Sequence, residues 1–243
     1  MNISLPGELH DMKRFAILFF LLLAASLQAQ SFSFQEETLD YSIRHNLFPG
    51  TIGSMTYHTH DAGSHWQVDA TLKAAVGSIY TLDCSYGSVF CKDAALTPVS
   101  ATRTQTEKKY WAKGRYDWSA PGQVHMDVTK SSRPPRDETL SWAGTVRDLL
   151  GMIWWLRTLD YEQPQLNPGQ NALLLDHDAL PVSISSYQKK TLKFNGQQVP
   201  VIEVVVAQDG KEALRLTLTD DADRKPLRFS IGLSFGTIKG TLK

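Results

Sequence analysis

VRDLLGMIWWLRTLDY, residues 146–161, is the stretch that decides the fold of this 243-residue chain. It carries a helical pattern in a sequence otherwise composed of short alternating strands. Its apolar residues, Trp154 and Trp155 among them, cover more of the helix circumference than one stripe. A helix that is apolar nearly all round has to be enclosed by the rest of the fold or by a partner. We therefore expect a helix near 140–160 that acts as a plug or lid across a curved β-sheet.

The segments before and after this helix alternate with a period of two, which is typical of half-buried antiparallel strands. The sequence therefore predicts a mainly β fold, with one antiparallel sheet curled into a half-barrel or open barrel around one long α-helix. The expected strands are Thr38–Ile43, Ile52–His60, Trp66–Leu72, Ser78–Cys84, Ser88–Lys92, Pro98–Thr106, Lys109–Tyr116, Val124–Val128, Leu173–Leu175, Val182–Gln188, Thr191–Asn195, Pro200–Val206, Ala213–Thr219, Pro226–Leu233 and Thr237–Leu242.

Turn chemistry separates these strands. Asp61–Ser64, Asn195–Gly196, Asp209–Gly210 and Asp220–Asp223 predict turns, because such residues tolerate positive φ or bond their own backbone. Ser131–Arg136 contains paired prolines, which predict a break and an extended connection into the helix. A shorter helix that begins at Asp148, with this carboxylate as its cap, is an alternative start.

Residues 1–29 have the pattern of an export signal. Lys13 and Arg14 precede the apolar run Phe15–Leu27, and Ala29 offers a small residue for cleavage. Met12 directly before the two basic residues is the expected start of translation. The apolar run is short for a membrane span, although an uncleaved anchor is the alternative. We therefore expect a periplasmic or secreted protein whose mature part, residues 30–243, is a single β-rich domain without a transmembrane span.

The charge balance limits the partners. The chain has 25 Lys and Arg residues and 25 Asp and Glu residues, so it has no broad positive field for nucleic acid. Cys84 and Cys91 are its two cysteines. In an exported protein two close cysteines are expected to form a disulfide bond, and a type II′ turn at Gly87 would place them opposite each other.

Several blocks resemble an exported bacterial family known as domain of unknown function 3108. The resemblance covers most of the mature chain and departs from the family at the cysteine pair and at Gly151. The blocks are Tyr41 with the early strands, Asp83 with Tyr86, Lys92–Pro98, Val146–Leu150, Trp155–Leu159 and Pro168–Gly169.

The resemblance implies a β-rich protein of the periplasm or cell surface. Its layout is similar to that of lipoprotein carriers of the LolA/LolB type, in which a sheet curls around helical lids. Because the family has no assigned activity, the resemblance implies no catalytic residue. Asp83, Asp148 and Arg157 match recurring charged positions of the family. We expect them to be partly buried and mutually satisfied, because an unpaired charge near a core is unfavourable.

Four aromatic residues are the candidate ligand-binding group: Trp142, Trp154, Trp155 and Tyr161. Their rings are apolar with one polar end, a character common at ligand surfaces. The alternative is that the adjacent Trp154 and Trp155 are both core residues.

Other polar clusters favour plain structural roles. His58, His60 and His65 could ligate zinc or copper at a hairpin, but they lack an obvious fourth ligand. We therefore expect exposed histidines, no metal site and no cofactor. Glu36–Glu37 and Asp220–Asp221 are paired carboxylates at a strand start and a turn, where solvated ends are the expected role.

The sequence thus predicts an exported envelope protein that binds or carries an apolar or amphiphilic ligand, such as a lipid or lipoprotein moiety, without catalysis. Displacement of the helix would open its cavity. The alternative is an envelope scaffold that docks a protein partner, and a hydrolase acting on glycan or cell wall is a third class.

Overall fold

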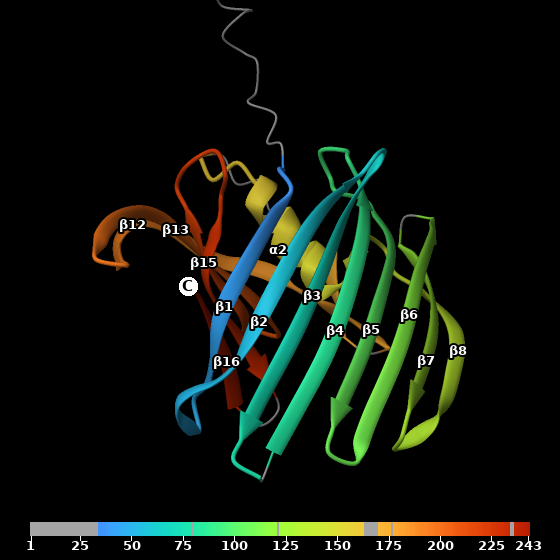
Figure 1. Cartoon of the computed structure of the whole chain (residues 1–243). Coiled ribbons are helices and arrows are strands. Elements are labelled where there is room, and N and C mark those ends of the chain that lie inside the picture. Colours follow the sequence, from blue (N-terminus) through green and yellow to red (C-terminus); the bar gives the residue numbers. More distant parts are fainter. Residues whose placement is uncertain (1–33, 79, 121, 163–169, 176, 234–235) are drawn as a thin grey trace, which may run out of the picture. The chain divides into compact units, whose positions relative to one another are not determined.

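The computed structural model describes residues 34–243, except 79, 121, 163–169, 176 and 234–235 (Figure 1). The expected export signal at residues 1–29 and the Pro168–Gly169 block lie outside the described residues. In the described part of the chain, no helix has the length and hydropathy needed to span a membrane.

Antiparallel pairing joins most of the described strands into one large sheet, as the alternation predicts. The sheet has thirteen strands in the order β12-β13-β14-β15-β16-β1-β2-β3-β4-β5-β6-β7-β8, so β12 and β8 are its edges and it does not close into a barrel. The strands are β1 Glu37–His45, β2 Phe48–Ala62, β3 His65–Val76, β4 Tyr80–Cys91, β5 Pro98–Glu107, β6 Tyr110–Ala120, β7 Gln123–Lys130, β8 Arg133–Ser141, β12 Ser183–Phe194, β13 Gln197–Gln208, β14 Lys211–Thr219, β15 Pro226–Leu233 and β16 Gly236–Leu242.

The predicted hairpin turns are confirmed by their backbone angles. Asn195 and Gly196 have φ of 47° and 83°, and Asp209 and Gly210 have φ of 49° and 74°. Two successive residues at positive φ give the twist that a two-residue hairpin needs. These turns fix the registers of β12 with β13 and of β13 with β14.

Three expected breaks are wrong. Thr191 continues β12 without interruption, and β4 runs unbroken through Gly87. Pro134 and Pro135 lie inside β8 and not in a loop. Because β8 is an edge strand, a proline there can lack its N–H without breaking a ladder on the open side.

The course of β4 corrects the disulfide prediction. Cys84 and Cys91 are free thiols on one strand, paired with Leu72 and His65 of β3. They are seven residues apart, which is about 23 Å at the rise of a strand, whereas a disulfide needs Cα atoms within about 7 Å. The hairpin at Gly87 is the wrong step in the prediction, because the local turn signal is overridden by pairing with both β3 and β5.

Alkylation of the purified protein in denaturant, without reductant, is expected to label both cysteines because neither is oxidised in this fold. Mass spectrometry of the intact chain measures the label. Reductant should not change the number of labels. Labelling that requires prior reduction would contradict the continuous β4.

A small second sheet precedes and follows the helix. It consists of β9 Thr145–Arg147, β10 Asn171–Leu175 and β11 Asp178–Pro181, with β9 parallel to β10. Since Thr145–Arg147 pair as a strand, the predicted helix start at Val146 is wrong.

The helix α2 spans Leu149–Thr158, and the alternative start at Asp148 is confirmed. The Asp148 side chain accepts hydrogen bonds from the N–H groups of Leu150 and Gly151, as an N-cap does. The helix is therefore ten residues long and shorter than the sequence suggested. Thr145–Arg147 instead form backbone hydrogen bonds with β10.

The predicted enclosure of this helix is confirmed. Seven of its ten residues are buried, and Trp154 and Leu156 have no exposed surface. Figure 1 shows α2 against the sheet, where it contacts β4, β9 and β10. The Trp154 ring packs on Tyr57 with centroids 5.5 Å apart, and Tyr57 in turn contacts Tyr41 and Phe229.

A buried cation holds the C-terminal end of α2. Arg157 is 3 % exposed and pairs with Glu37 of β1. It also donates to the carbonyl oxygens of Asp223 and Arg224, at 3.0 and 3.1 Å. One guanidinium therefore joins the helix to the start of β1 and to the β14–β15 turn.

Arg157→Ala is expected to lower the free energy of unfolding by about 3–5 kcal/mol, because it leaves Glu37 without its partner in a largely buried place. The matched control is Lys73→Ala, which removes an exposed lysine 4.0 Å from Asp83 and should change the free energy by less than about 1 kcal/mol. Urea denaturation measures both. Equal effects of the two substitutions would contradict the role of Arg157.

Candidate functional site

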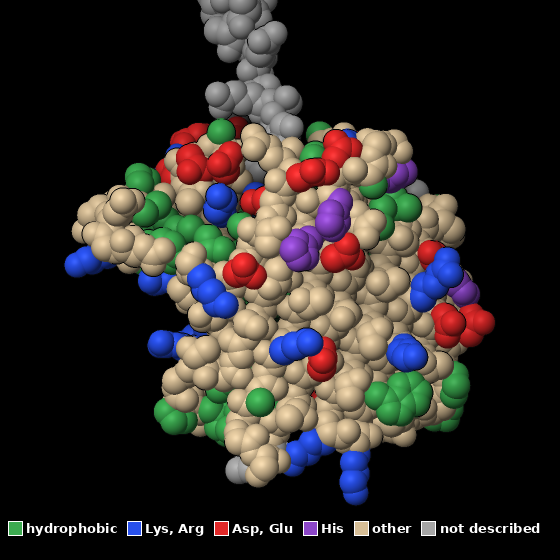
Figure 2. All heavy atoms as spheres, viewed as in Figure 1, with side chains coloured by type: hydrophobic (Ala, Val, Ile, Leu, Met, Phe, Trp, Pro, Cys, Tyr) green, Lys and Arg blue, Asp and Glu red, His purple; other side chains and the backbone are tan. Residues whose placement is uncertain are grey.

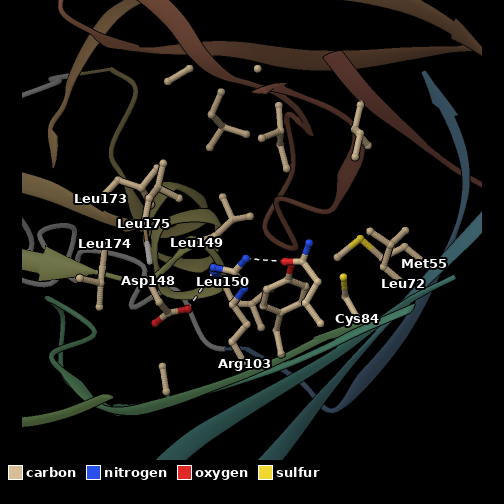
Figure 3. Close-up of a pocket in the computed structure, with 18 of the residues that line it drawn as sticks. Met55, Leu72, Cys84, Arg103, Asp148, Leu149, Leu150, Leu173, Leu174 and Leu175 are labelled. Carbon is tan, nitrogen blue, oxygen red and sulfur yellow. Dashed lines mark hydrogen bonds between the residues drawn. The ribbon is translucent and has the colours of Figure 1, made fainter. Parts of the chain in front are cut away.

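A cavity of about 590 Å³ lies between the concave face of the sheet, the N-terminal end of α2 and β10 (Figure 3). Strands of both halves of the sheet contribute to its wall, with Met55, Leu72 and Leu82 on one side and Leu214 and Ile231 on the other. Leu72 and Leu82 alternate with exposed residues along their strands, as inward-facing side chains do. The wall is therefore largely aliphatic.

The small second sheet and the helix close one part of this wall. Leu173, Leu174 and Leu175 of β10 and Leu149 and Leu150 of α2 line the cavity. Figure 3 shows these leucines around the end of the helix. The cavity thus lies between sheet and helix, as the sequence predicted.

One inward row of β5 is polar. Arg103, Gln105 and Glu107 line the cavity, and they alternate with the exposed residues Thr102, Thr104 and Thr106. The Arg103 guanidinium donates to the Gln105 amide oxygen, and the Gln105 amide nitrogen donates to Glu107 at 3.4 Å. Figure 3 shows Arg103 reaching from the strand toward the end of α2. A polar row therefore crosses an otherwise apolar wall.

Strand β4 faces this polar row. Tyr86, Cys84 and Leu82 lie directly across from Arg103, Gln105 and Glu107 in the register. Burial, helped by the charge of Glu107 and a hydrogen bond to it, raises the pKa of Tyr80 to about 12. Burial also raises the pKa of the Cys84 thiol. Both groups are therefore neutral at physiological pH, and the Tyr80 hydroxyl donates a hydrogen bond to Glu107.

The cap of α2 forms part of the cavity wall. Asp148 accepts a hydrogen bond from Ser88 at 2.8 Å in addition to the two N–H groups of the helix. Burial raises the pKa of this carboxyl, and the hydrogen bonds from Ser88 and the helix N–H groups only partly oppose that effect. A Cβ at Gly151 would lie 3.0 Å from the Asp148 carboxylate, so the glycine avoids a close contact with the capping side chain.

The two ends of the cavity differ. The helix is held at one end of the sheet, by Arg157 at the β14–β15 turn and by Arg147, which donates to the carbonyl oxygen of Ala95 between β4 and β5. The other end has polar lining residues at the starts and ends of β4, β5, β13 and β14. These rim residues are Tyr80, Glu107, Gln208, Asp209 and Lys211. The polar rim is therefore remote from the C-terminal half of the helix.

The four aromatic residues expected to bind a ligand do not line this cavity. Trp154 is fully buried on Tyr57, and Tyr161 is buried with its hydroxyl donating to the Leu156 carbonyl at 2.7 Å. Both occupy the core, which for Trp154 is the alternative that the sequence left open. Trp155 lies under the Arg147 guanidinium, 4.5 Å from its ring centroid.

Trp142 lies between β8 and β9 and is partly buried. It packs against an apolar cluster that includes Tyr116, Val124 and Leu174, and two of these residues, Tyr116 and Leu174, also line the cavity. Like the other three, it contributes to packing in this structure and not to the cavity wall.

The three charged positions are not brought together. Asp148 and Arg157 are at opposite ends of α2, and each is satisfied by other groups. Asp83 is exposed on the outer side of β4, so the expectation that it is buried is wrong. Its side chain points away from the core because it alternates with Leu82 and Cys84.

Of the three histidines considered for a metal site, His58 and His60 are exposed and His65 is half-buried. His58 and His60 stack with ring centroids 6.1 Å apart, and His60 lies 3.3 Å from Asp69. Among the described residues, no group of three or more His, Cys, Asp or Glu side chains is arranged to hold a metal ion.

The polar row of β5 is the feature that the sequence reasoning missed. The signal was present in Thr102–Glu107, TRTQTE, where threonine alternates with Arg, Gln and Glu. Period two shows that the long polar side chains share a face. It does not show that this face is the inner one, which depends on the register with β4.

Comparison with known proteins identifies the family. The sequence model of the family described as "Protein of unknown function (DUF3108)" matches residues 40–243. The chain belongs to this family. No curated protein matches the chain.

Among solved structures, the DUF3108 chain is similar to a beta-barrel-like protein of domain of unknown function DUF1849 from Brucella abortus. The TM-score is 0.55 at 12 % identity, with 86 % of this chain and 96 % of the other covered. At this identity the likeness concerns the fold alone.

The raised pKa of Asp148 predicts a pH effect on stability. The folded protein binds this proton more tightly than the unfolded chain, whose Asp pKa is about 3.9. The contribution of Asp148 to the free energy of unfolding should therefore fall as pH rises from about 4 through the raised folded pKa. Asp148→Asn keeps a capping oxygen but does not titrate, so the stability of the wild type relative to this variant should decline over the same pH range.

Urea denaturation of both proteins across this pH range measures the difference. A difference that is constant with pH, or that grows in favour of the wild type as pH rises, would contradict the assignment.

Proposed function

We propose that this protein is an exported envelope protein that binds and carries an apolar or amphiphilic molecule in the cavity between sheet and α2. The observation that carries the proposal is the cavity itself, whose volume of about 590 Å³ lies within the roughly 300–1,000 Å³ of small-molecule sites. The ligand class is a lipid or a lipid-like moiety with a polar end.

The distribution of polar groups supports an amphiphile in particular. Leu72, Leu82 and Leu214 offer aliphatic surface for a hydrocarbon chain. Gln105 and Glu107 of the polar row of β5 lie beside this aliphatic surface. A molecule with one polar end can bury its hydrocarbon chain on the leucines, and its head group can form hydrogen bonds with the polar row. A plain hydrocarbon would exclude water from the polar row without replacing its hydrogen bonds.

The anchoring of α2 bears on how the ligand enters. Arg157 ties one end of the helix to Glu37 and two carbonyls, and Asp148 ties the other end to Ser88. Displacing the helix would break these buried bonds. We propose instead that the ligand enters past Tyr80 and Lys211 at the polar rim, while α2 remains in place.

We propose a likeness to lipoprotein carriers of the LolA/LolB type in one respect. A curled antiparallel sheet encloses a helix and leaves a largely aliphatic cavity beside it. Together with the export signal predicted at residues 1–29, this supports transport of a lipid moiety within the envelope. The proposed role is non-enzymatic.

A second candidate role, docking of a protein partner, is favoured by the edge strand β12. Its central residues Ser185–Thr191 are exposed, and one side of its backbone has no strand beside it in the sheet. An exposed edge can pair with a strand of another chain. Crosslinking in the native envelope separates the two roles, because a carrier should be recovered mainly without a partner.

Leu82→Trp is expected to weaken ligand binding about tenfold or more, because the indole fills space that the ligand would occupy. Titration with a fluorescent fatty acid measures the affinity. The matched control is Leu47→Trp, at a position 63 % exposed and outside the cavity, which should leave the affinity unchanged.

Circular dichroism establishes that both variants fold. Folded protein purified from cells should also release a lipid on extraction, detected by mass spectrometry. Equal affinities of the two variants, or the absence of any fatty-acid binding by the wild type, would refute the proposal.

A further inference from the structure

A second hollow, of about 710 Å³, lies on the outer face of the sheet and is separate from the ligand cavity. Ser230 and Lys239 line it, whereas their chain neighbours Ile231 and Ile238 line the cavity on the inner face. The two sites are therefore on opposite sides of β15 and β16. We refer to this hollow, lined by β12, β14, β15, β16 and β1, as the basic groove.

The groove exists because the sheet bends outward at its β12 edge. Strands β12 and β1 are five strand spacings apart in the sheet, about 24 Å if it were flat. Lys190 of β12 and Arg44 of β1 nevertheless line the same hollow. Figure 2 shows the projecting β12–β13 hairpin with a notch below it and basic side chains around the notch.

The floor of the groove carries a row of cations. Arg215, Ser230, Lys239 and Arg44 lie side by side across β14, β15, β16 and β1. Arg44 is directly opposite Lys239, and like charges in such a pair are destabilising. Arg228 belongs to the next row, opposite Thr241. A bound anion would relieve the repulsion between Arg44 and Lys239.

The carboxylates of the groove are already engaged. Glu203 accepts from Lys190 at 2.7 Å and from Arg215 at 2.9 Å, and Glu212 pairs with Arg215. Burial alone would raise the pKa of Glu203, but the hydrogen bond from Lys190 and the charges of Lys190 and Arg215 outweigh it and lower the pKa, so Glu203 is ionised.

Three cations that line the groove have no carboxylate partner among the described residues. Arg44, Arg228 and Lys239 form no ion pair with any residue in the described part of the chain. All three are exposed, so they are accessible to a ligand.

Hydroxyl groups lie between these cations. Ser42 and Thr241 are opposite each other in the row that contains Arg228, and both line the groove. Two guanidinium groups, one ammonium group and several hydroxyls match a group with several anionic oxygens better than a single carboxylate.

We propose that the basic groove is a binding site for a phosphate group. The ligand is either a small phosphorylated molecule or the phosphate of a lipid head group, since both present the same oxygens. Because the chain as a whole is electrically balanced, the attraction is local to the groove and not a general affinity for polyanions.

The test uses the full chain, two probes and two double variants. The probes are inorganic phosphate, followed by protein-detected NMR titration, and vesicles of phosphatidylglycerol in phosphatidylcholine, followed by co-sedimentation. Arg44→Gln with Lys239→Gln removes two cations of the groove. Lys109→Gln with Lys113→Gln removes the same charge from β6 and the turn before it, and serves as the matched control.

The groove variant should bind at least about tenfold more weakly than the wild type, and the control variant should bind as the wild type does. The binding should weaken as salt is added. Because Arg44 and Lys239 repel each other, the groove variant should unfold at the same temperature as the wild type or higher, so lost binding would not reflect lost folding.

Binding of vesicles alone supports a lipid head group as the source of the phosphate, and binding of inorganic phosphate alone supports a free phosphorylated molecule. Binding of neither probe by the wild type, or equal affinities of the groove and control variants, would overturn the proposal. Neither result depends on whether a fatty acid occupies the inner cavity.

Discussion

The enclosure of α2 is the constraint on which the rest of the structure depends. A ten-residue helix with apolar side chains on nearly every side is stable in water only when it is covered. The sheet curls round it, and β9 and β10 cover its other side. The fold therefore has a plug at one end of the sheet, and the space beyond the plug is the cavity.

Contacts at both ends of α2 hold the helix in place. The cost of burying Arg157 and Asp148 is offset only because each charged or polar group finds several partners. Those partners come from the start of β1, from the β14–β15 turn and from β4. The helix thus joins strands that are distant in the sequence, and a mobile lid is less consistent with these contacts than a fixed wall.

The same sheet presents different chemistry on its two faces. Around β14, β15 and β16 the inner side is aliphatic and faces the cavity, while the outer side carries the cations of the basic groove. Strand alternation makes this possible without any extra element, since neighbouring residues point to opposite sides. The phosphate site proposed for the outer face and the ligand cavity proposed for the inner face therefore occupy opposite sides of the same strands.

The sequence by itself determined the β-rich class, most strand positions, the two-residue turns at Asn195 and Asp209 and the enclosure of the apolar helix, because these depend on local periodicity and backbone preference. Only the tertiary structure decided that β4 runs unbroken through Gly87, that Pro134 belongs to an edge strand and that helix α2 begins after β9. It also decided which polar residues face inward, so that Arg103 lines the cavity whereas Asp83 is exposed. These outcomes depend on the register and curvature of strands that are far apart in the sequence. Hydrogen bonds between such strands do not produce a periodic pattern in the sequence, so the pattern cannot predict them.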